Sequence, residues 1–526
     1  MKQRLLLLLI FLPGILLGQQ KVVFPDDFNT SLNGKEVIIT NPLIITDTRQ
    51  LNSNGILVLA AERIQSATEE YEPGEVMYAQ WQKEFPTRIL SLKVDKTVFY
   101  RTGQQTTNLT GTVSVSNGTY TIIPQIAPSF VGNERTTHPR EVTAPHNLKI
   151  ASFNLNFYIA NPSLWNPDYG AANLNEFTRQ RTKILAALKA INADIYALCE
   201  VGEGKTAVQD IVKGLNDIAG TNRYAYTDNG DTKESTYTKN VFFYNTDKVE
   251  PYKEVRTIGS YLKLRHIAQA FNLKENQERL IISLNHFKSK SSGSGTDADQ
   301  YDGQGKSNNQ RQAEARTLVN ELNTLTNYYE DPDILILGDL NAYSQEDPIQ
   351  ILTNASLVNL LKRFSPQDYS YVYNGTTGYL DHSIASASMN QQVIDATPWH
   401  INADEQSKFG YKNTANYSPD PYRCSDHDPV ITTLMLNQAT GIYTPDTEYK
   451  NRIQISGNPQ DGYLTLQSER IDKVEVLNIS GQVLFTNIPT VTGNYFILPT
   501  DGLIGGFYII RVYCDNYCIT DKIVLP

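Results

Sequence analysis

Short runs in which hydrophobic and polar residues alternate dominate the chain between residues 21 and 145. The runs KEVIIT, GILVLA, RILSLKV and LTGTVSVSNGTYTIIP are rich in Val, Ile and Thr, and Gly, Asn and Pro separate them. A period of two in β-branched residues is typical of strands with one buried face. The pattern therefore predicts a small all-β barrel or sandwich domain over residues 19–145.

From Leu148 onward, strand-like runs alternate with helical patterns. LKIASFNL and ADIYALCEV are predicted strands, and the segment between them carries an apolar stripe with helical spacing at Ile184, Leu185, Leu188 and Ile191. A second helix is predicted over NQRQAEARTLVNELNTLTNY, followed by the strand DILILGDL. Such alternation is typical of α/β domains, and we expect one over residues 146–438.

A polar segment, NQATGIYTPDTEYKN, interrupts this pattern, and residues 439–446 are predicted to be a linker. The runs RIQIS, YLTLQ, KVEVLNI, GQVLF and FYIIRVY follow, with Gly and Asn turns between them. Residues 447–526 are therefore expected to form another small all-β domain.

The N-terminal stretch has the pattern of a secretory signal peptide. Lys2 and Arg4 precede an apolar run from Leu5 to Leu17, and the small residue Gly18 stands before Gln19. Because this run is too short to span a bilayer comfortably, we expect residues 1–18 to be removed on export; an uncleaved anchor is the alternative. We expect an exported protein without stable membrane insertion and, by default, a monomer.

The charge balance limits the classes of partner. The chain has 526 residues and a formal net charge of −10, which argues against a protein whose whole surface binds polyphosphate. A nucleic-acid substrate stays open, because a local basic groove and a bound cation can neutralise phosphates on an acidic protein.

Four cysteines in an exported chain of this length do not make a disulfide scaffold. Cys514 and Cys518 are close enough in sequence to pair locally, and pairing of Cys199 with Cys424 is conceivable. Buried free thiols are an equal alternative for both pairs.

Four short strings in the α/β region set His, Asp or Asn beside predicted strand ends: NHFKSK (285–290), GDLNA (338–342), YLDHSIAS (379–386) and SDHDPV (425–430). With Asn154 in SFNLNFY and Glu200 in IYALCEV, they supply oxygen ligands for a hard cation and two histidines for proton transfer. Glu200 ends an apolar strand, where an isolated carboxylate is costly unless it binds something. The combination predicts a Mg²⁺-dependent phosphodiesterase site at strand-to-loop junctions.

The residue types also suggest individual roles. Asp339 and Asn341 are two apart in an expected extended segment, so both side chains would flank one phosphate. His427 needs a partner that fixes its tautomer and raises its basicity, and Asp381 is the candidate. His286, at the end of the strand LIISLNH, would stabilise the transition state or protonate the leaving group.

Each feature taken singly has a plainer interpretation. A histidine at a strand end is more often structural, and GDLNA alone could be a turn. The remaining histidines are treated as structural or unassigned: His138, His146, His266, His382 and His400.

The segment KSKSSGSGTDADQYDGQG, at 288–305, has low complexity. Its acids lack the spacing of an EF-hand, so a solvated loop is expected rather than a structural Ca²⁺ site. Basic residues flank it and could form a phosphate-binding rim or simply a solvated charged face. They are Lys288, Lys290, Lys306, Arg311 and Arg316.

On these strings, residues of about 147–437 resemble the bacterial extracellular nuclease branch of the endonuclease/exonuclease/phosphatase superfamily. NHFKSKSSGSGTDADQYDGQG with NNQRQAEA, WHINADE (399–405) and YRCSDHDPV are close to that branch's own signatures. The resemblance implies an α/β four-layered sandwich of two packed mixed β-sheets with helices outside.

The same resemblance implies a role for each matching residue. Asn154 matches the phosphate-orienting Asn, and Glu200 matches the metal-binding Glu. The two catalytic histidines correspond to His286 and His427, and Asp381 to the Asp that supports the second of them.

Further matches concern the metal and the substrate. Asp339 and Asn341 match the phosphate- and metal-site pair, and Asp426 matches a further metal-site carboxylate. Arg265 falls where relatives carry an Arg that touches the nucleic-acid backbone, and Lys288 and Arg311 are expected to bind substrate as well.

One position departs from the related pancreatic-type deoxyribonucleases, which pair the first His with a Glu before the strand that is VFFY here. Thr238, Lys239 and Asn240 stand there instead. Either Glu234 or another group substitutes, or His286 is oriented differently.

The two flanking regions carry resemblances of their own. The N-terminal β region resembles an OB-like module, which could bind single-stranded nucleic acid or act as a spacer. The C-terminal piece, with NPQDGYLTLQ and VEVLNISGQVL, resembles a type IX secretion sorting domain, which implies the type IX machinery as a partner and outer-membrane export; an adhesion module is the alternative.

Together these features predict a secreted Mg²⁺-dependent endonuclease that cleaves extracellular DNA, and RNA as a further option, leaving 5′-phosphate ends. Ca²⁺ or Mn²⁺ are alternative cations. The competing hypotheses are a phosphodiesterase or phosphatase for lipid or inositol phosphates, and a binding or adhesion protein with a vestigial site.

Overall fold

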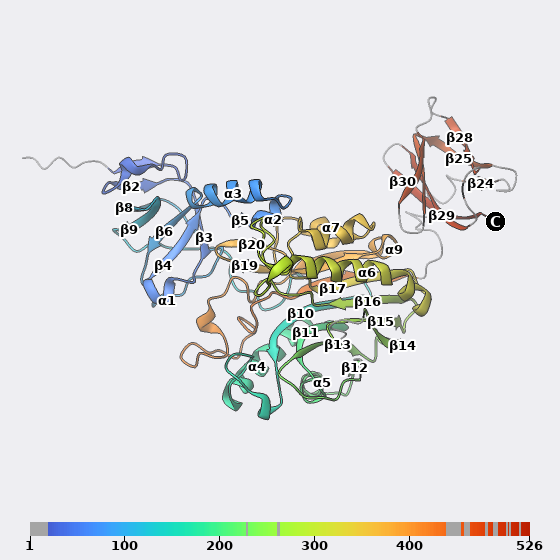
Figure 1. The fold of residues 1–526 in the computed structure, drawn as a ribbon, viewed down its shortest axis with the longest axis horizontal. Coiled ribbons are helices and arrows are strands. Elements are labelled where there is room, and N and C mark those ends of the chain that lie inside the picture. The colour runs from blue at the N-terminus through green and yellow to red at the C-terminus, as the bar shows by residue number, and fades with distance from the viewer. Residues whose placement is uncertain are drawn as a thin grey trace, which may run out of the picture. The chain divides into compact units, whose positions relative to one another are not determined.

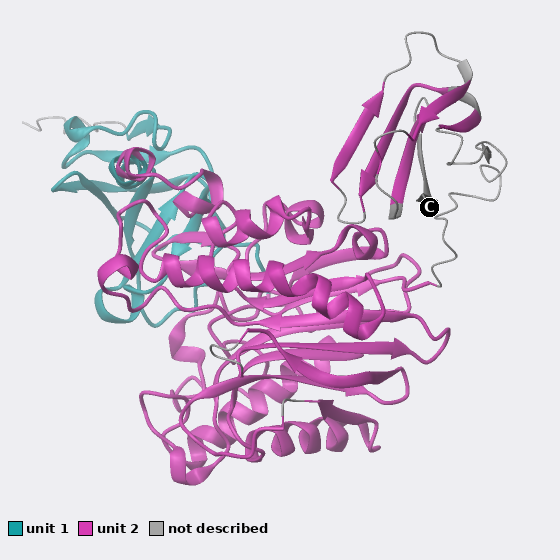
Figure 2. Cartoon of the chain, turned by 45° about the vertical axis from the view of Figure 1, so that its right-hand side comes forward, with its two compact units in different colours: residues 1–64, 81–134 teal, residues 65–80, 135–526 magenta. Residues whose placement is uncertain are grey.

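The computed structural model describes residues 19–227, 230–259 and 264–437, and in the C-terminal region 454–456, 463–478, 482–487, 493–500, 503, 506–514 and 517–525. The expected signal peptide and linker lie outside the described residues. The chain divides into two compact units: unit 1 holds residues 1–64 and 81–134, and unit 2 holds residues 65–80 and 135–526 (Figure 2).

Unit 1 is built on one eight-stranded sheet, in the order β1-β2-β8-β9-β6-β4-β3-β7. Alternate residues face its core: Leu57 and Leu59 of β4 pair with Leu92 and Leu90 of β6, and all four are buried. The bounds are β1 Gln20–Val22, β2 Glu36–Ile39, β3 Leu43–Asp47, β4 Ile56–Ala60, β6 Ile89–Lys93, β7 Gln105–Thr106, β8 Leu109–Ser116 and β9 Thr119–Pro124. The segment with the period-two pattern thus forms a β-sheet domain. The OB-like character of this domain stays a prediction.

The centre of unit 2 is a pair of six-stranded mixed sheets. The first has the order β12-β13-β11-β10-β23-β22 and the second β14-β15-β16-β17-β21-β18. The first comprises β10 Leu148–Tyr158, β11 Ile195–Gly202, β12 Tyr224–Thr227, β13 Thr238–Asn245, β22 Val393–Pro398 and β23 Val430–Leu434. The second comprises β14 Val249–Thr257, β15 His266–Leu273, β16 Arg279–Asn285, β17 Ile334–Asp339, β18 Val358–Asn359 and β21 Asp381–Ala385.

The two sheets pack face to face around one apolar core. The central strands are buried on both faces, since helices cover the face that points away from this core. In β11, Ile195 and Ala197 belong to the core between the sheets, whereas Tyr196 and Leu198 belong to the core under the helices. Burial on both faces explains why IYALCEV is a nearly continuous apolar run.

Helices cover the outer face of each sheet (Figure 1). The helices α4 (Leu174–Ile191) and α5 (Thr206–Ala219) lie on the first sheet, and α6 (Asn308–Tyr329) and α7 (Asp347–Asn354) on the second. The predicted stripe of α4, from Ile184 to Ile191, is buried. The expected four-layered α/β sandwich is therefore confirmed.

The second segment of unit 2 begins at Arg135 rather than at the expected domain boundary at residue 145. Arg135 forms an ion pair with Glu405, and the Trp399 Nε1 donates to the Thr136 Oγ1 at 2.8 Å. These residues thus pack with the α/β fold, although Pro145 is the stronger sequence signal.

The C-terminal region forms two small antiparallel sheets with a separate core around Leu466, Val474 and Ile510. The sheets comprise β24 Gln454–Ser456, β25 Tyr463–Ile471 and β28 Gly493–Pro499, and β26 Lys473–Asn478, β27 Val483–Asn487, β29 Gly506–Cys514 and β30 Tyr517–Leu525. The side chains of Cys514 and Cys518 lie outside the described residues. Among the helices that the structure describes, none is long and apolar enough to cross a membrane.

Candidate active site

The ends of several central strands meet at one edge of the two sheets. β10 runs parallel to β11, and β16 runs parallel to β17. β21 runs antiparallel to β17, so that its first residue, Asp381, lies opposite Asp339, the last residue of β17. This topology brings strings that are far apart in the sequence to the same place.

A glycine allows the close approach at the end of β17. Gly338 has φ +123°, and a Cβ there would lie 1.9 Å from the Asn285 carbonyl oxygen. Only glycine tolerates both the backbone conformation and this contact. Asp339 is therefore held directly against the end of β16, which His286 follows.

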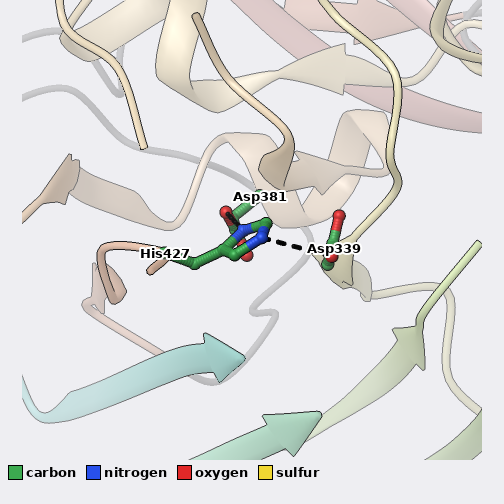
Figure 3. A group of neighbouring side chains, drawn as sticks. All are labelled: Asp339, Asp381 and His427. Carbon is green, nitrogen blue, oxygen red and sulfur yellow. Dashed lines mark hydrogen bonds and ion pairs between the residues drawn. The ribbon is translucent and has the colours of Figure 1, made fainter. Parts of the chain in front are cut away.

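His427 is held by Asp381. Its Nδ1 donates to Asp381 Oδ2 at 2.7 Å, and its Nε2 lies 3.9 Å from Asp339 Oδ2 (Figure 3). Burial disfavours the charged imidazole, but the Asp381 and Asp339 carboxylates outweigh it and raise the pKa of His427 well above its usual value. The expected pairing of His427 with Asp381 is present.

Asp339 Oδ2 is the point where the polar groups converge. Asn154 Nδ2 donates to it at 3.1 Å, and His286 Nε2 lies 3.6 Å away. Burial and the charge of Asp381 raise the pKa of Asp339 to about 6, against the opposing effect of His427. A buried carboxylate in such surroundings is poised to bind a cation.

Glu200 approaches the same group from β11. The residue has φ +59°, and its Oε2 accepts a hydrogen bond at 2.9 Å from the Phe157 backbone N–H, where β10 bulges. Burial raises the pKa of Glu200 to about 7, and the charges of Asp426 and Asp339 add to this. Bulges of this kind often re-aim side chains beside active sites.

His286 faces two of these carboxylates through one nitrogen. Its Nε2 lies 3.8 Å from Glu200 Oε1, besides its approach to Asp339. Burial lowers the pKa of His286 well below its usual value, and the nearby Arg265 adds to this. Glu234 does not substitute for the missing Glu, because its carboxylate caps the start of α5 at Thr206.

The oxygen donors fit a hard divalent cation. Burial and the charges of Asp426 and Asp339 raise the pKa of Glu200, and burial and the charge of Asp381 raise the pKa of Asp339. A bound dication would favour the charged form of these carboxylates. The ligand atoms of Asp339, Asp381 and His427 also lie within 4.8 Å of one another. Asp381 Oδ2 also accepts the His427 hydrogen bond.

The environment of Asn341 differs from the expected extended segment. β17 ends at Asp339, and Asn341 has φ +48°, so its backbone is left-handed. Its N–H donates to Asp339 Oδ1 at 2.9 Å, and its Nδ2 donates to the Phe287 carbonyl at 3.1 Å. The turn alternative for GDLNA is thus correct locally, yet the turn leaves Asn341 beside Asp339.

The predicted phosphate-binding rim is only partly supported. Arg265 and Lys288 are half-buried, and their charges lower the pKa of His286, which locates them near the site. Assigning Arg311 to substrate binding was wrong, because its side chain is 0% exposed and donates to the carbonyls of Lys288, Lys306 and Gln304. This arginine supports the loop from within.

Backbone hydrogen bonds hold the acidic side chains of the low-complexity loop. Asp299 and Asp302 accept from the N–H groups of Tyr301 and Gln304 two residues later, and Asp297 accepts from the N–H of Gln310 in α6. These bonds occupy carboxylate oxygens that a Ca²⁺ site would need. The solvated-loop interpretation is favoured. Cys199 and Cys424 are buried free thiols.

Sequence reasoning missed the network behind His427, although its members stand in WHINADE and SDHDPV. Asn402 Nδ2 donates to the His427 carbonyl at 2.6 Å, and Asn402 Oδ1 accepts from the Ser425 N–H at 3.1 Å. Asp428 Oδ1 accepts from the N–H groups of residues 401, 402 and 403. His400, left unassigned from the sequence, donates to Asp428 at 2.8 Å.

The fold is a four-layered α/β sandwich, and its strand ends bring buried carboxylates and histidines together. The family model for the endonuclease/exonuclease/phosphatase family matches residues 151–427. The chain belongs to this family, whose members hydrolyse phosphoester bonds and depend on divalent metal ions. A model for the secretion system C-terminal sorting domain matches residues 455–526, which indicates type IX export to the cell surface or the extracellular space.

Comparison with solved structures gives distant likenesses. A family member from Bacteroides vulgatus is 15% identical with a TM-score of 0.39, over 55% of this chain and 99% of its own. The mannosyl-6-phosphatase of Bacteroides thetaiotaomicron is 16% identical with a TM-score of 0.36, over 54% and 98%. D. rerio TDP2, solved with a single-strand DNA product, is 14% identical with a TM-score of 0.34, over 54% and 98%. No curated protein matches the chain.

Proposed function

We propose that this protein is an exported, Mg²⁺-dependent endonuclease that hydrolyses phosphodiester bonds of extracellular DNA. The observation that carries the proposal is the convergence on Asp339 Oδ2 of His286, His427 and Asn154, at 3.6, 3.9 and 3.1 Å. Two histidines, an amide and a carboxylate around one point are the groups that an in-line displacement at phosphorus needs.

His427 is the proposed general base. Its Nδ1 carries a proton that it donates in a hydrogen bond to Asp381. In the neutral imidazole, Nε2 is then the nitrogen that accepts the proton of a water molecule. The water oxygen attacks phosphorus while the bond to the 3′ oxygen breaks, so the product carries a 5′-phosphate. Asp381 keeps the imidazole in the required tautomer and stabilises its charged form.

Asn154, Asn341 and His286 are the proposed groups that orient the phosphate and the departing oxygen. The two amides offer N–H donors at the site, and His286 is neutral at physiological pH because burial and Arg265 lower its pKa. A neutral imidazole can donate one hydrogen bond to the departing oxygen without adding a net charge. Arg265 and Lys288 supply positive charge beside it.

Glu200, Asp339 and Asp426 would hold the cation. When bound, the cation would neutralise the charge of the phosphate. It would also neutralise carboxylates that raise the pKa of His427. The base form of His427 is then available at a lower pH than in the cation-free protein.

Nucleic acid is the proposed substrate class because GDLNA and the Gly/Ser-rich loop after Lys288 and Lys290 favour it over lipid or inositol phosphates. DNA is proposed as the principal substrate, with RNA as a second one. The C-terminal sorting domain supports an extracellular substrate.

The test uses the mature protein from Gln19 with supercoiled plasmid, in Mg²⁺ and in EDTA. The His427→Ala variant is compared with His146→Ala, since His146 is exposed and its Nδ1 bonds to the Ala144 carbonyl. Nicking that needs Mg²⁺, persists in His146→Ala and disappears in His427→Ala supports the proposal. Undiminished nicking by His427→Ala, or release of phosphocholine from sphingomyelin vesicles without nicking, overturns it.

A further inference from the structure

A segment that precedes the matched family region by about 80 residues contributes buried groups to the α/β unit. Residues 65–80 belong to unit 2, whereas the family match begins at residue 151. The helix α2 (Ala67–Glu70) lies in this segment, and its residues Thr68 and Glu69 are each 1% exposed. The side chains of both are therefore part of the interior of unit 2.

Glu69 joins two loops that are distant in the sequence. Its Oε1 accepts a hydrogen bond from Ser344 Oγ at 2.7 Å, and its Oε2 accepts from the N–H groups of Ser344 and Tyr379 at 3.1 and 3.2 Å. Lys362 Nζ forms an ion pair with Oε1. The carboxylate is thus satisfied by a cation, a hydroxyl and two backbone amides.

Both loops lead directly into the candidate active site. Ser344 lies three residues after Asn341, on the chain that leaves Asp339, and Tyr379 lies two residues before Asp381. Glu69 therefore links the loop that follows β17, which ends at Asp339, to the loop that precedes β21, which begins at Asp381.

The packing around this tie is close. A Cβ on Gly378 would lie 2.5 Å from the Tyr343 ring and 3.4 Å from Glu69 Oε2. Thr68 repeats the pattern one residue earlier: its carbonyl accepts from the Gln345 N–H at 3.0 Å, and its Oγ1 donates to Glu346 at 2.7 Å. Two successive residues of α2 thus bind three successive residues of the loop after Asn341.

We propose that Glu69 is a positioning residue of the phosphodiesterase site, supplied from outside the family region. The inference rests on the proposed function for its catalytic readout. Removing the carboxylate leaves two buried backbone N–H groups and a hydroxyl without an acceptor, so the loops must shift to reach water. Such a shift moves Asp339 and Asp381 relative to each other, since each stands at the strand end next to one loop.

The experiment compares Glu69→Ala and Glu69→Gln with Glu70→Ala in the full mature chain. Glu70 is the matched control because it is the next residue of α2, is exposed, and bonds to the hydroxyl of Tyr71. Steady-state kinetics on an oligonucleotide give kcat and KM, and calorimetric titration with Mn²⁺ gives the cation affinity without substrate. Circular dichroism confirms that each variant is folded.

For Glu69→Ala we expect kcat to fall by about 10- to 100-fold with KM changed by less than about threefold, since misplacement rather than lost substrate contact is the cause. Its Mn²⁺ affinity should fall by about tenfold. Glu69→Gln, which keeps an acceptor oxygen, should recover part of both. Glu70→Ala should match the wild type.

A folded Glu69→Ala protein with wild-type kcat and Mn²⁺ affinity overturns the inference. If Glu69→Ala does not fold, Glu69→Gln and the milder Ser344→Ala decide by the same two readouts, and wild-type values in both overturn it. If the wild type cleaves no phosphodiester, the proposed function fails, and the Mn²⁺ affinities of the series still support or overturn the role of Glu69.

Discussion

His400 provides a pH-dependent contribution to stability whose size follows from its surroundings. Its Nδ1 donates to Asp428 Oδ2 at 2.8 Å and its Nε2 to Asp368 Oδ1 at 2.6 Å. The ring also stacks on Tyr369, with centroids 4.2 Å apart and planes 10° apart. Since both nitrogens donate, the bound form is the imidazolium ion.

Burial alone would lower the pKa of His400, but the hydrogen bonds to Asp368 and Asp428 outweigh it and raise the pKa to about 10. An unfolded chain has a histidine pKa of about 6.5. The contribution to stability is therefore complete below about pH 6.5 and is lost as the pH rises through about 10.

Between these two values the folded protein holds one more proton than the unfolded chain. The free energy of unfolding then falls by up to about 1.4 kcal/mol for each pH unit, or up to about 2.7 kcal/mol between pH 7 and pH 9. The His400 side chain is 23% exposed, so solvent reduces the slope below this limit. His400→Gln removes the titration and hence this part of the slope.

Urea unfolding at pH 7, 8 and 9, followed by the emission of the buried Trp399 next to His400, measures the effect. The gap in the free energy of unfolding between wild type and His400→Gln should narrow steadily as the pH rises. His146→Gln, a substitution at an exposed histidine, is the control. A constant gap for His400→Gln from pH 7 to pH 9 would refute the reasoning.

Three further predictions concern the site. Asp381→Asn keeps an acceptor for His427 Nδ1 but removes the charge that favours the imidazolium ion, so kcat should fall by about 10²- to 10⁴-fold with little change in the melting temperature; a loss under tenfold would contradict the base assignment. Asn402→Ala deletes the hydrogen bonds behind His427 and should cost about 1–3 kcal/mol in urea unfolding as well as activity. Gly338→Ala places a Cβ against the Asn285 carbonyl and should yield no soluble folded protein, measured as recovery after size-exclusion chromatography.

The local elements of this protein are encoded in short stretches of its sequence. The helical stripe of α4 and the apolar run of β11 are periodic patterns, and each depends on neighbours within a few residues. The strings around His286, Asp339, Asp381 and His427 mark strand ends, and strand ends of a packed pair of sheets meet at one edge. The sequence therefore determined the α/β architecture, and it predicts which residues stand at these strand ends.

The conformation and burial of single residues were decided by contacts that no local pattern contains. Asn341 adopts a left-handed turn because its amide groups bond to Asp339 and to the Phe287 carbonyl. Arg311 looks like a surface cation in a polar helix, yet it is buried because three loop carbonyls need donors.

Glu69 is the strongest case of this difference. In the sequence it is one acid in the polar string ATEEYEPGE, far from any strand-end motif. In the structure it bonds to Ser344, 275 positions away, and to Tyr379, 310 positions away. Periodicity and motifs report on neighbours along the chain, whereas the burial of a charge depends on which donors the completed fold brings to it. The sequence alone determined the strands, the helices and the residue types at their ends, and only the tertiary structure decided which distant residue bonds to the loops beside those ends.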